Sequence, residues 1–105
     1  MSVHRVVYAP EADAHLSVIY RYLAAEASPA TAMTFLERLL EICESLAQHP
    51  ERGASRFDIR PGLRVLSHRR RITISYFFEN EEVTILGIYV GGQNYRTLLE
   101  DDRLD

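Results

Sequence analysis

The chain has no lysine and only one cysteine, and both shortages restrict its chemistry. Cys43 has no partner for an intrachain disulfide and lies among apolar residues with helical spacing, so we interpret it as a small core residue and not as a reactive thiol. The sequence also lacks a glycine-rich phosphate loop, a Cys/His set with metal-ligand spacing and a serine in a nucleophile-elbow context. We therefore expect no metal site and no cofactor.

Long apolar runs are missing as well. No segment approaches the roughly 20 apolar residues that cross a bilayer, and the N-terminus has no apolar stretch behind a basic start. These features predict a cytoplasmic protein that does not enter a membrane. The length of 105 residues, with 47% hydrophobic and 26% charged, predicts one domain over residues 1–105, with a partly frayed acidic tail over residues 96–105.

Positive charge is confined to the middle of a chain whose net charge is −3. Residues 1–48 carry three Arg and six acids, residues 49–72 carry seven Arg and two acids, and residues 73–105 carry two Arg and seven acids. Because all twelve basic residues are Arg, the middle zone offers planar bidentate donors that suit carboxylates and phosphates. The codon bias of a GC-rich genome would equally deplete lysine.

A short strand and an amphipathic helix open the chain. Residues 3–9 are rich in β-branched and aromatic side chains, and Pro10 ends this predicted strand because proline cannot donate to a sheet ladder. Helical spacing of apolar residues then predicts a helix over residues 11–26.

A second helix follows after a short connection. Ser28 is a candidate N-cap and Pro29 a candidate first helical residue, and the helix should end near Gln48 because Pro50 disfavours helical backbone at the residue before it. The apolar stripes of the two helices consist of Leu16, Ile19, Tyr20 and Leu23, and of Ala32, Phe35, Leu36, Leu39, Cys43 and Leu46. Two such stripes predict a helical hairpin with one shared apolar face.

Three strands are expected in the second half of the chain. Residues 50–62 are rich in turn formers and charge and are interpreted as a long ordered loop. Strands are predicted over residues 63–67, 71–78 and 83–90, joined by connections short enough for antiparallel hairpins, and the last is apolar on both faces and should be central. The sequence therefore predicts an α+β domain: a strand, a helical hairpin, then a three-stranded antiparallel meander, with the helices packed on one face of the sheet and the other face partly open.

The arginine block lies beside the one histidine that stands next to other candidate chemistry. We place His68 in the turn between two strands, together with Arg69, Arg70 and Arg71. A general acid or base beside cations that stabilise a phosphate is one interpretation, and a solvated hairpin turn is the other.

The order of elements and three motifs resemble the RelE/ParE superfamily of bacterial toxins, and more closely its ParE branch. The motifs are "HPERG" after the second helix, "GLR" at the start of the second strand, and an arginine-rich hairpin leading into "RITISYFF" and "VTILGIYV". The resemblance covers about residues 3–95. It implies the toxin of a type II toxin-antitoxin system, held in a hetero-oligomer with a cognate antitoxin protein.

What the resemblance implies about the target differs between branches. RelE-like members are ribosome-dependent endoribonucleases that cleave mRNA with Lys, Arg and Tyr side chains, and ParE-like members inhibit DNA gyrase by binding it. Arg64 falls on the arginine of the "GLR" motif, while residues 91–94 are Gly, Gly, Gln and Asn where the ribonuclease branch has basic residues. This departure and the net negative charge favour gyrase as the target. If the protein were a ribonuclease, its catalytic residues would be Arg64, His68, Arg71 and Tyr95.

The resemblance also gives the arginines a binding role. We expect Arg64, Arg69, Arg70 and Arg71 to form one cationic patch on the open side of the sheet, which binds the target or is masked by an acidic segment of the antitoxin. Apolar neighbours in the strand should fix the direction of the Arg64 side chain. In the alternative interpretation, Arg64 pairs with the acidic tail of its own chain. A degenerate toxin that only binds its antitoxin is a third possibility.

Overall fold

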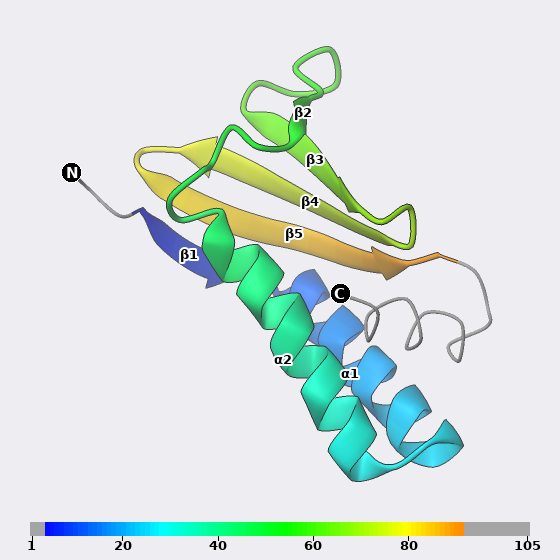
Figure 1. Ribbon diagram of the computed structural model, residues 1–105. Coiled ribbons are helices and arrows are strands. Elements are labelled where there is room, and N and C mark those ends of the chain that lie inside the picture. The colour runs from blue at the N-terminus through cyan, green and yellow to red at the C-terminus, as the bar shows by residue number, and fades with distance from the viewer. Residues whose placement is uncertain (1–3, 92–105) are drawn as a thin grey trace.

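Two helices and five strands make up residues 4–91, the part of the chain that the computed structural model describes (Figure 1). The elements are β1 (Arg5–Tyr8), α1 (Pro10–Glu26), α2 (Pro29–Ser45), β2 (Ala54–Ser55), β3 (Leu63–His68), β4 (Ile72–Glu79) and β5 (Glu82–Val90). The predicted order of strand, helical hairpin and meander is confirmed. The tail predicted over residues 96–105 lies outside the described residues.

The strands form one mixed sheet with the order β1-β5-β4-β3-β2. The pairs β3–β4 and β4–β5 are antiparallel hairpins, whereas β1 runs parallel to β5. β5 thus has a neighbour on each side, as its apolar sequence on both faces predicted. The two helices pack together on one face of this sheet (Figure 1).

β2 was not predicted, because it is a two-residue strand within the segment interpreted as a loop. Ala54 pairs with Val65 and Ser55 with Arg64 at the sheet edge. Two residues with small side chains provide no alternation of apolar and polar positions, so this strand has no pattern to recognise.

The hairpin turns use left-handed backbone at residues other than glycine. Asn80 and Glu81 have φ of 55° and 60°, and Arg69 and Arg70 have φ of 56° and 61°. In the second turn, the Arg71 N–H donates to the His68 carbonyl oxygen at 3.1 Å. His68 was predicted in the turn, but it is the last residue of β3 and pairs with Ile72, because the two left-handed residues that reverse the chain follow it.

α2 begins as its sequence indicated and ends slightly earlier. The Thr31 N–H donates to the Ser28 hydroxyl oxygen at 3.0 Å, which makes Ser28 the N-cap ahead of Pro29. The helix ends at Ser45 rather than near Gln48, because the next three N–H groups bond to carbonyls three residues back, in a tighter turn than an α-helix.

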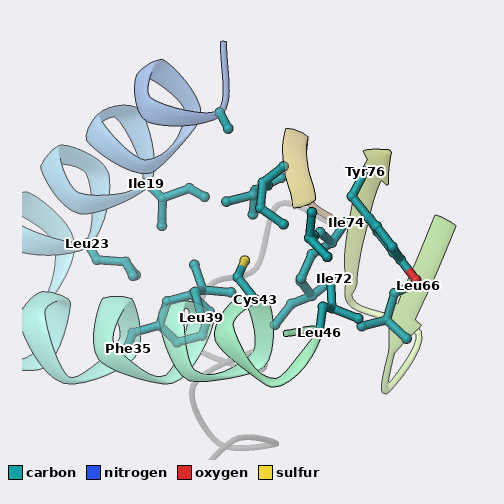
Figure 2. Packing of buried hydrophobic residues seen from close by; sticks show 14 of the residues in the cluster. Ile19, Leu23, Phe35, Leu39, Cys43, Leu46, Leu66, Ile72, Ile74 and Tyr76 are labelled. Carbon is teal, nitrogen blue, oxygen red and sulfur yellow. The ribbon is translucent and has the colours of Figure 1, made fainter. Parts of the chain in front are cut away.

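The core fills the space between the helical hairpin and the sheet (Figure 2). It contains both predicted stripes, with Leu16, Tyr20 and Leu36 partly buried at its margin. Cys43 is fully buried as predicted, and burial, followed by the neighbouring Glu44 carboxylate, raises the pKa of its thiol to about 12. A single core of this kind requires both helices to lie on the same face of the sheet.

α1 also protects the part of β5 that extends beyond the short β1. A register shift where β4 passes from Ser75 to Tyr76 leaves Leu86 as the extra residue of β5. Beyond this bulge the Ile88 N–H donates to His15 Nδ1 of α1 at 3.1 Å. A sheet edge that would otherwise be open is thereby covered by a helix. Neither helix in residues 4–91 has both the length and the apolar character needed to cross a bilayer.

We predict that Ser28→Ala lowers the free energy of unfolding by about 1 kcal/mol, because it removes the acceptor that caps α2. Chemical denaturation followed by circular dichroism measures this change. Ser17→Ala on the exposed side of α1 is the control and should alter stability by less than about 0.5 kcal/mol. Equal effects of the two substitutions would contradict the capping role.

Candidate protein-binding site

The outer side of the helical hairpin carries a groove of about 470 Å³ between α1 and α2. Its lining consists of Asp13, Leu16, Ser17, Tyr20, Arg21, Met33 and Leu36. Met33 is 46% exposed although it is a large apolar residue. On another side of α1, Val18 and Tyr22 lie one turn apart and are exposed as well. Apolar surface of this kind on a small domain is typical of a protein-binding face.

A buried tyrosine connects the core to the segment that follows α2. The Tyr76 ring is fully buried, and its hydroxyl donates to the Pro50 carbonyl at 2.8 Å and accepts from the Gly53 N–H at 2.9 Å. Burial raises the pKa of Tyr76, although the Gly53 hydrogen bond and nearby Arg64 act in the opposite direction. The hydroxyl therefore stays neutral and holds both backbone groups at physiological pH.

Gly53 has no room for a side chain at this position. A Cβ atom on Gly53 would lie 2.8 Å from the Tyr76 hydroxyl oxygen and 3.0 Å from the Val65 backbone carbon. The glycine of the "HPERG" motif is therefore explained by the close approach of this segment to β3 and β4.

Arg64 completes the same arrangement. Its guanidinium Nη1 donates to the Gly53 carbonyl at 2.8 Å and to the Glu51 carbonyl at 3.3 Å. The side chain therefore has a fixed direction, as predicted, but its hydrogen-bond partners among residues 4–91 are backbone carbonyls of its own chain. Any pairing with the acidic tail lies outside the described residues.

The structure does not place Arg64 in one patch with the arginines of the hairpin turn. Arg64 lies near the start of β3, where it is opposite Tyr76 of β4. Arg69, Arg70 and Arg71 follow the end of β3. At about 3.3 Å per residue, the Cα atoms of Arg64 and His68 are about 13 Å apart. The alternation along β3 also directs Arg64 to the same sheet face as the core residue Leu66, and not to the open face. The predicted single patch is therefore wrong.

Of the residues proposed for RNA cleavage, the structure brings His68 and Arg71 together but not Arg64. His68 and Arg71 lie at one end of β3, Arg64 lies near the other, and Tyr95 is outside the described residues. Among residues 4–91, no three His, Cys, Asp or Glu side chains are grouped as metal ligands.

A second exposed surface was missed by the sequence analysis. Phe57 and Ile59 protrude from the segment between β2 and β3, and the Arg60 guanidinium carbon lies 3.9 Å from the centre of the Phe77 ring. The sequence feature that could have indicated this surface is the alternation of two apolar residues with charged residues in "RFDIR". A segment rich in turn formers, however, does not predict that these residues are exposed in a fixed geometry.

These features define a small α+β domain whose exposed apolar surfaces suit protein partners. The sequence matches a family described as the ParE toxin of the type II toxin-antitoxin system parDE over residues 6–95. The chain therefore belongs to the ParE toxin family.

A solved structure shares the fold. It is described as the chromosomal ParDE toxin-antitoxin system from P. aeruginosa, with a TM-score of 0.72 and 24% sequence identity, covering 86% of this chain and 98% of that one. A search of curated proteins gave no significant match.

We predict that Tyr76→Phe lowers the free energy of unfolding by about 1 to 3 kcal/mol, because it leaves the Gly53 N–H and Pro50 carbonyl without their shared partner. Tyr89→Phe is the control, since Tyr89 is 53% exposed, and it should change stability by less than about 0.5 kcal/mol. Denaturant titration of both variants tests the comparison. A stability of Tyr76→Phe equal to the wild type would show that the hydroxyl contributes nothing to the fold.

We predict that Arg64→Ala lowers the free energy of unfolding more than Arg70→Ala does. Arg64→Ala removes hydrogen bonds to two carbonyls and should lower the free energy of unfolding by about 1 kcal/mol with the fold intact by circular dichroism. Arg70 is exposed in the turn, and Arg70→Ala should have an effect below about 0.5 kcal/mol. Indistinguishable denaturation midpoints would contradict the distinction.

Proposed function

We propose that this ParE-family toxin inhibits DNA gyrase by binding it, and that a cognate antitoxin neutralises it by covering the groove of the helical hairpin. The observation that carries the proposal is the family match over residues 6–95. The toxin acts in the cytoplasm, where gyrase and its antitoxin are found.

The groove supports the antitoxin part of the proposal. It runs between two helices and is lined by Leu16, Tyr20, Met33 and Leu36, together with one acid, one serine and one arginine. An amphipathic segment of a partner can place its apolar side chains in such a groove and its polar face toward solvent. Because this seals exposed apolar surface, the resulting hetero-oligomer should be more soluble than the toxin alone.

The arrangement of polar residues favours binding over RNA cleavage. A general acid or base and the cations that stabilise a phosphate must converge on one reacting group. Arg64 is separated from His68 and Arg71 by the length of β3, and its guanidinium is bonded to backbone carbonyls. In this proposal Arg64 orients the segment after α2, while Arg69, Arg70 and Arg71 contribute positive charge to target or antitoxin binding.

Three parallel assays test the proposed target. The purified toxin should inhibit DNA supercoiling by gyrase, and its induction should cause DNA-damage signalling and filamentation, while translation in a cell-free extract continues. Arrest of translation with mRNA cut at ribosome-bound codons would overturn the gyrase proposal in favour of the ribonuclease activity. A chain that forms a complex with its antitoxin but affects neither process would be a degenerate toxin.

A substitution that introduces a charge into the groove tests whether the antitoxin binds there. Met33→Asp should weaken antitoxin binding by about tenfold or more, because a carboxylate would be buried against apolar groups of the partner. Affinity is measured by titrating the labelled antitoxin segment with the purified variant. Ile59→Asp, a matched substitution in the loop before β3, is the control and should leave the affinity within about threefold of the wild type. Equal weakening by both would contradict the assignment of the groove.

A further inference from the structure

The segment between β2 and β3 exposes two large apolar side chains within one short loop. Ile59 is 62% exposed and Phe57 is 53% exposed. Exposed apolar residues at single positions are common, but two large ones in a loop of five residues concentrate apolar surface in one part of the molecule. We call residues 56–60, from Arg56 to Arg60, the Phe57–Ile59 loop.

Hydrogen bonds hold the Phe57–Ile59 loop in one conformation. The Arg56 N–H donates to the Leu63 carbonyl at 2.8 Å, and the N–H groups of Ile59 and Arg60 donate to the Arg56 carbonyl at 3.0 and 3.2 Å. The Arg56 guanidinium also binds the Asp58 carboxylate through two nitrogen atoms, each at 3.1 Å, which lowers the pKa of Asp58. Phe57 and Ile59 are therefore presented by an organised loop, and little conformational entropy remains to be lost on binding.

Two arginines lie against aromatic rings beside this loop. The Arg60 guanidinium covers the Phe77 ring at 3.9 Å, and the Arg64 guanidinium lies 5.3 Å from the centre of the Phe57 ring. A guanidinium stacked on a ring still directs its N–H groups outward in its own plane, where they can bind a carboxylate. Among residues 4–91 Arg60 has no ion pair, and the acid nearest in sequence, Asp58, is already held by Arg56.

The loop is separate from the groove of the helical hairpin. It follows β2 at the sheet edge opposite β1, and in Figure 1 it lies at the end of the molecule away from the connection between α1 and α2. An antitoxin segment seated between Leu16 and Met33 therefore leaves this loop exposed.

We infer that the Phe57–Ile59 loop, with Arg60 beside it, is a docking surface for an acidic segment of the toxin's target protein. The segment would place an aliphatic or aromatic side chain against Phe57 and Ile59 and a carboxylate on the Arg60 guanidinium. This inference rests on the proposed function, in which the target is a protein and the antitoxin occupies the groove. Charge complementarity supports an acidic partner, because residues 56–64, which comprise the loop and the start of β3, carry three Arg and one acid in a chain whose net charge is −3.

The same features favour a protein over a nucleic acid. A phosphate backbone gains nothing from Phe57 and Ile59, and the Asp58 carboxylate between them would repel it. An acidic protein segment that carries apolar side chains uses both the apolar pair and the positive charge.

The test uses the full chain with matched variants. Ile59→Asp places a negative charge in the exposed apolar pair, and Arg60→Gln removes one positive charge while keeping a long side chain over Phe77. We expect each to weaken binding of purified DNA gyrase by about tenfold or more and to relieve growth arrest on induction, with antitoxin affinity unchanged. Met33→Asp should show the reverse pattern. Retained antitoxin binding and circular dichroism establish that the loop variants are folded.

Each other outcome overturns a defined part of the inference. Loop variants that arrest growth and bind gyrase like the wild type would show that the loop is not a docking surface. Loss of antitoxin binding in the loop variants would assign the loop to the antitoxin instead, and loss of binding to a bare DNA duplex would assign it to a nucleic acid. If the wild type arrests growth without binding gyrase, the gyrase proposal fails, and the growth phenotype of the variants still decides whether the loop contacts the target.

Discussion

The burial of one sheet face beneath the helical hairpin is the constraint on which the other features depend. Because the apolar stripes of α1 and α2 meet the same face of β3, β4 and β5, both helices keep an outer side that no other element within residues 4–91 covers. The groove between them and the exposed Met33 follow from this arrangement. At the end of the core, the hydroxyl of the buried Tyr76 forms hydrogen bonds with the backbone of Pro50 and Gly53. The core therefore also positions the start of the segment before β3.

The elements with strong periodic patterns were predictable from the sequence. The apolar stripes that include Leu23 and Leu39 predicted both helices, and the Ser28-Pro29 pair predicted the start of α2. The predicted bounds of the meander strands agree with the structure to within one or two residues. The exceptions were features set by tertiary contact. β2 depends on its pairing with β3, and the position of Arg64 relative to Arg69 depends on strand register, which a local sequence pattern does not encode.

The types of residue in the candidate site were predictable from the sequence, but their positions and contacts in the fold were not. Sequence reasoning identified arginines as the source of positive charge and an antitoxin as the partner. It did not anticipate that Arg64 bonds to Gly53 and Glu51 of its own chain, since such hydrogen bonds link residues that are more than ten positions apart. Nor did it assign a role to Phe57, because exposure is a property of the folded loop. If the proposed antitoxin groove and the proposed target loop are both correct, the toxin can hold both partners at once, and the antitoxin does not neutralise it by competing for the loop.

The arginine turn links backbone conformation to charge at one position of the fold. Two left-handed residues in a tight turn are ordinarily Asn and Gly, because left-handed backbone costs other residues about 1 to 2 kcal/mol each. Here Arg69 and Arg70 adopt this conformation. Replacing Arg69 and Arg70 with Asn and Gly would remove the cost of the left-handed backbone, but it would also remove two positive charges from the tip of the β3–β4 hairpin. Stability and electrostatic potential are therefore coupled at this position, and a sequence drifting toward greater stability would become less cationic.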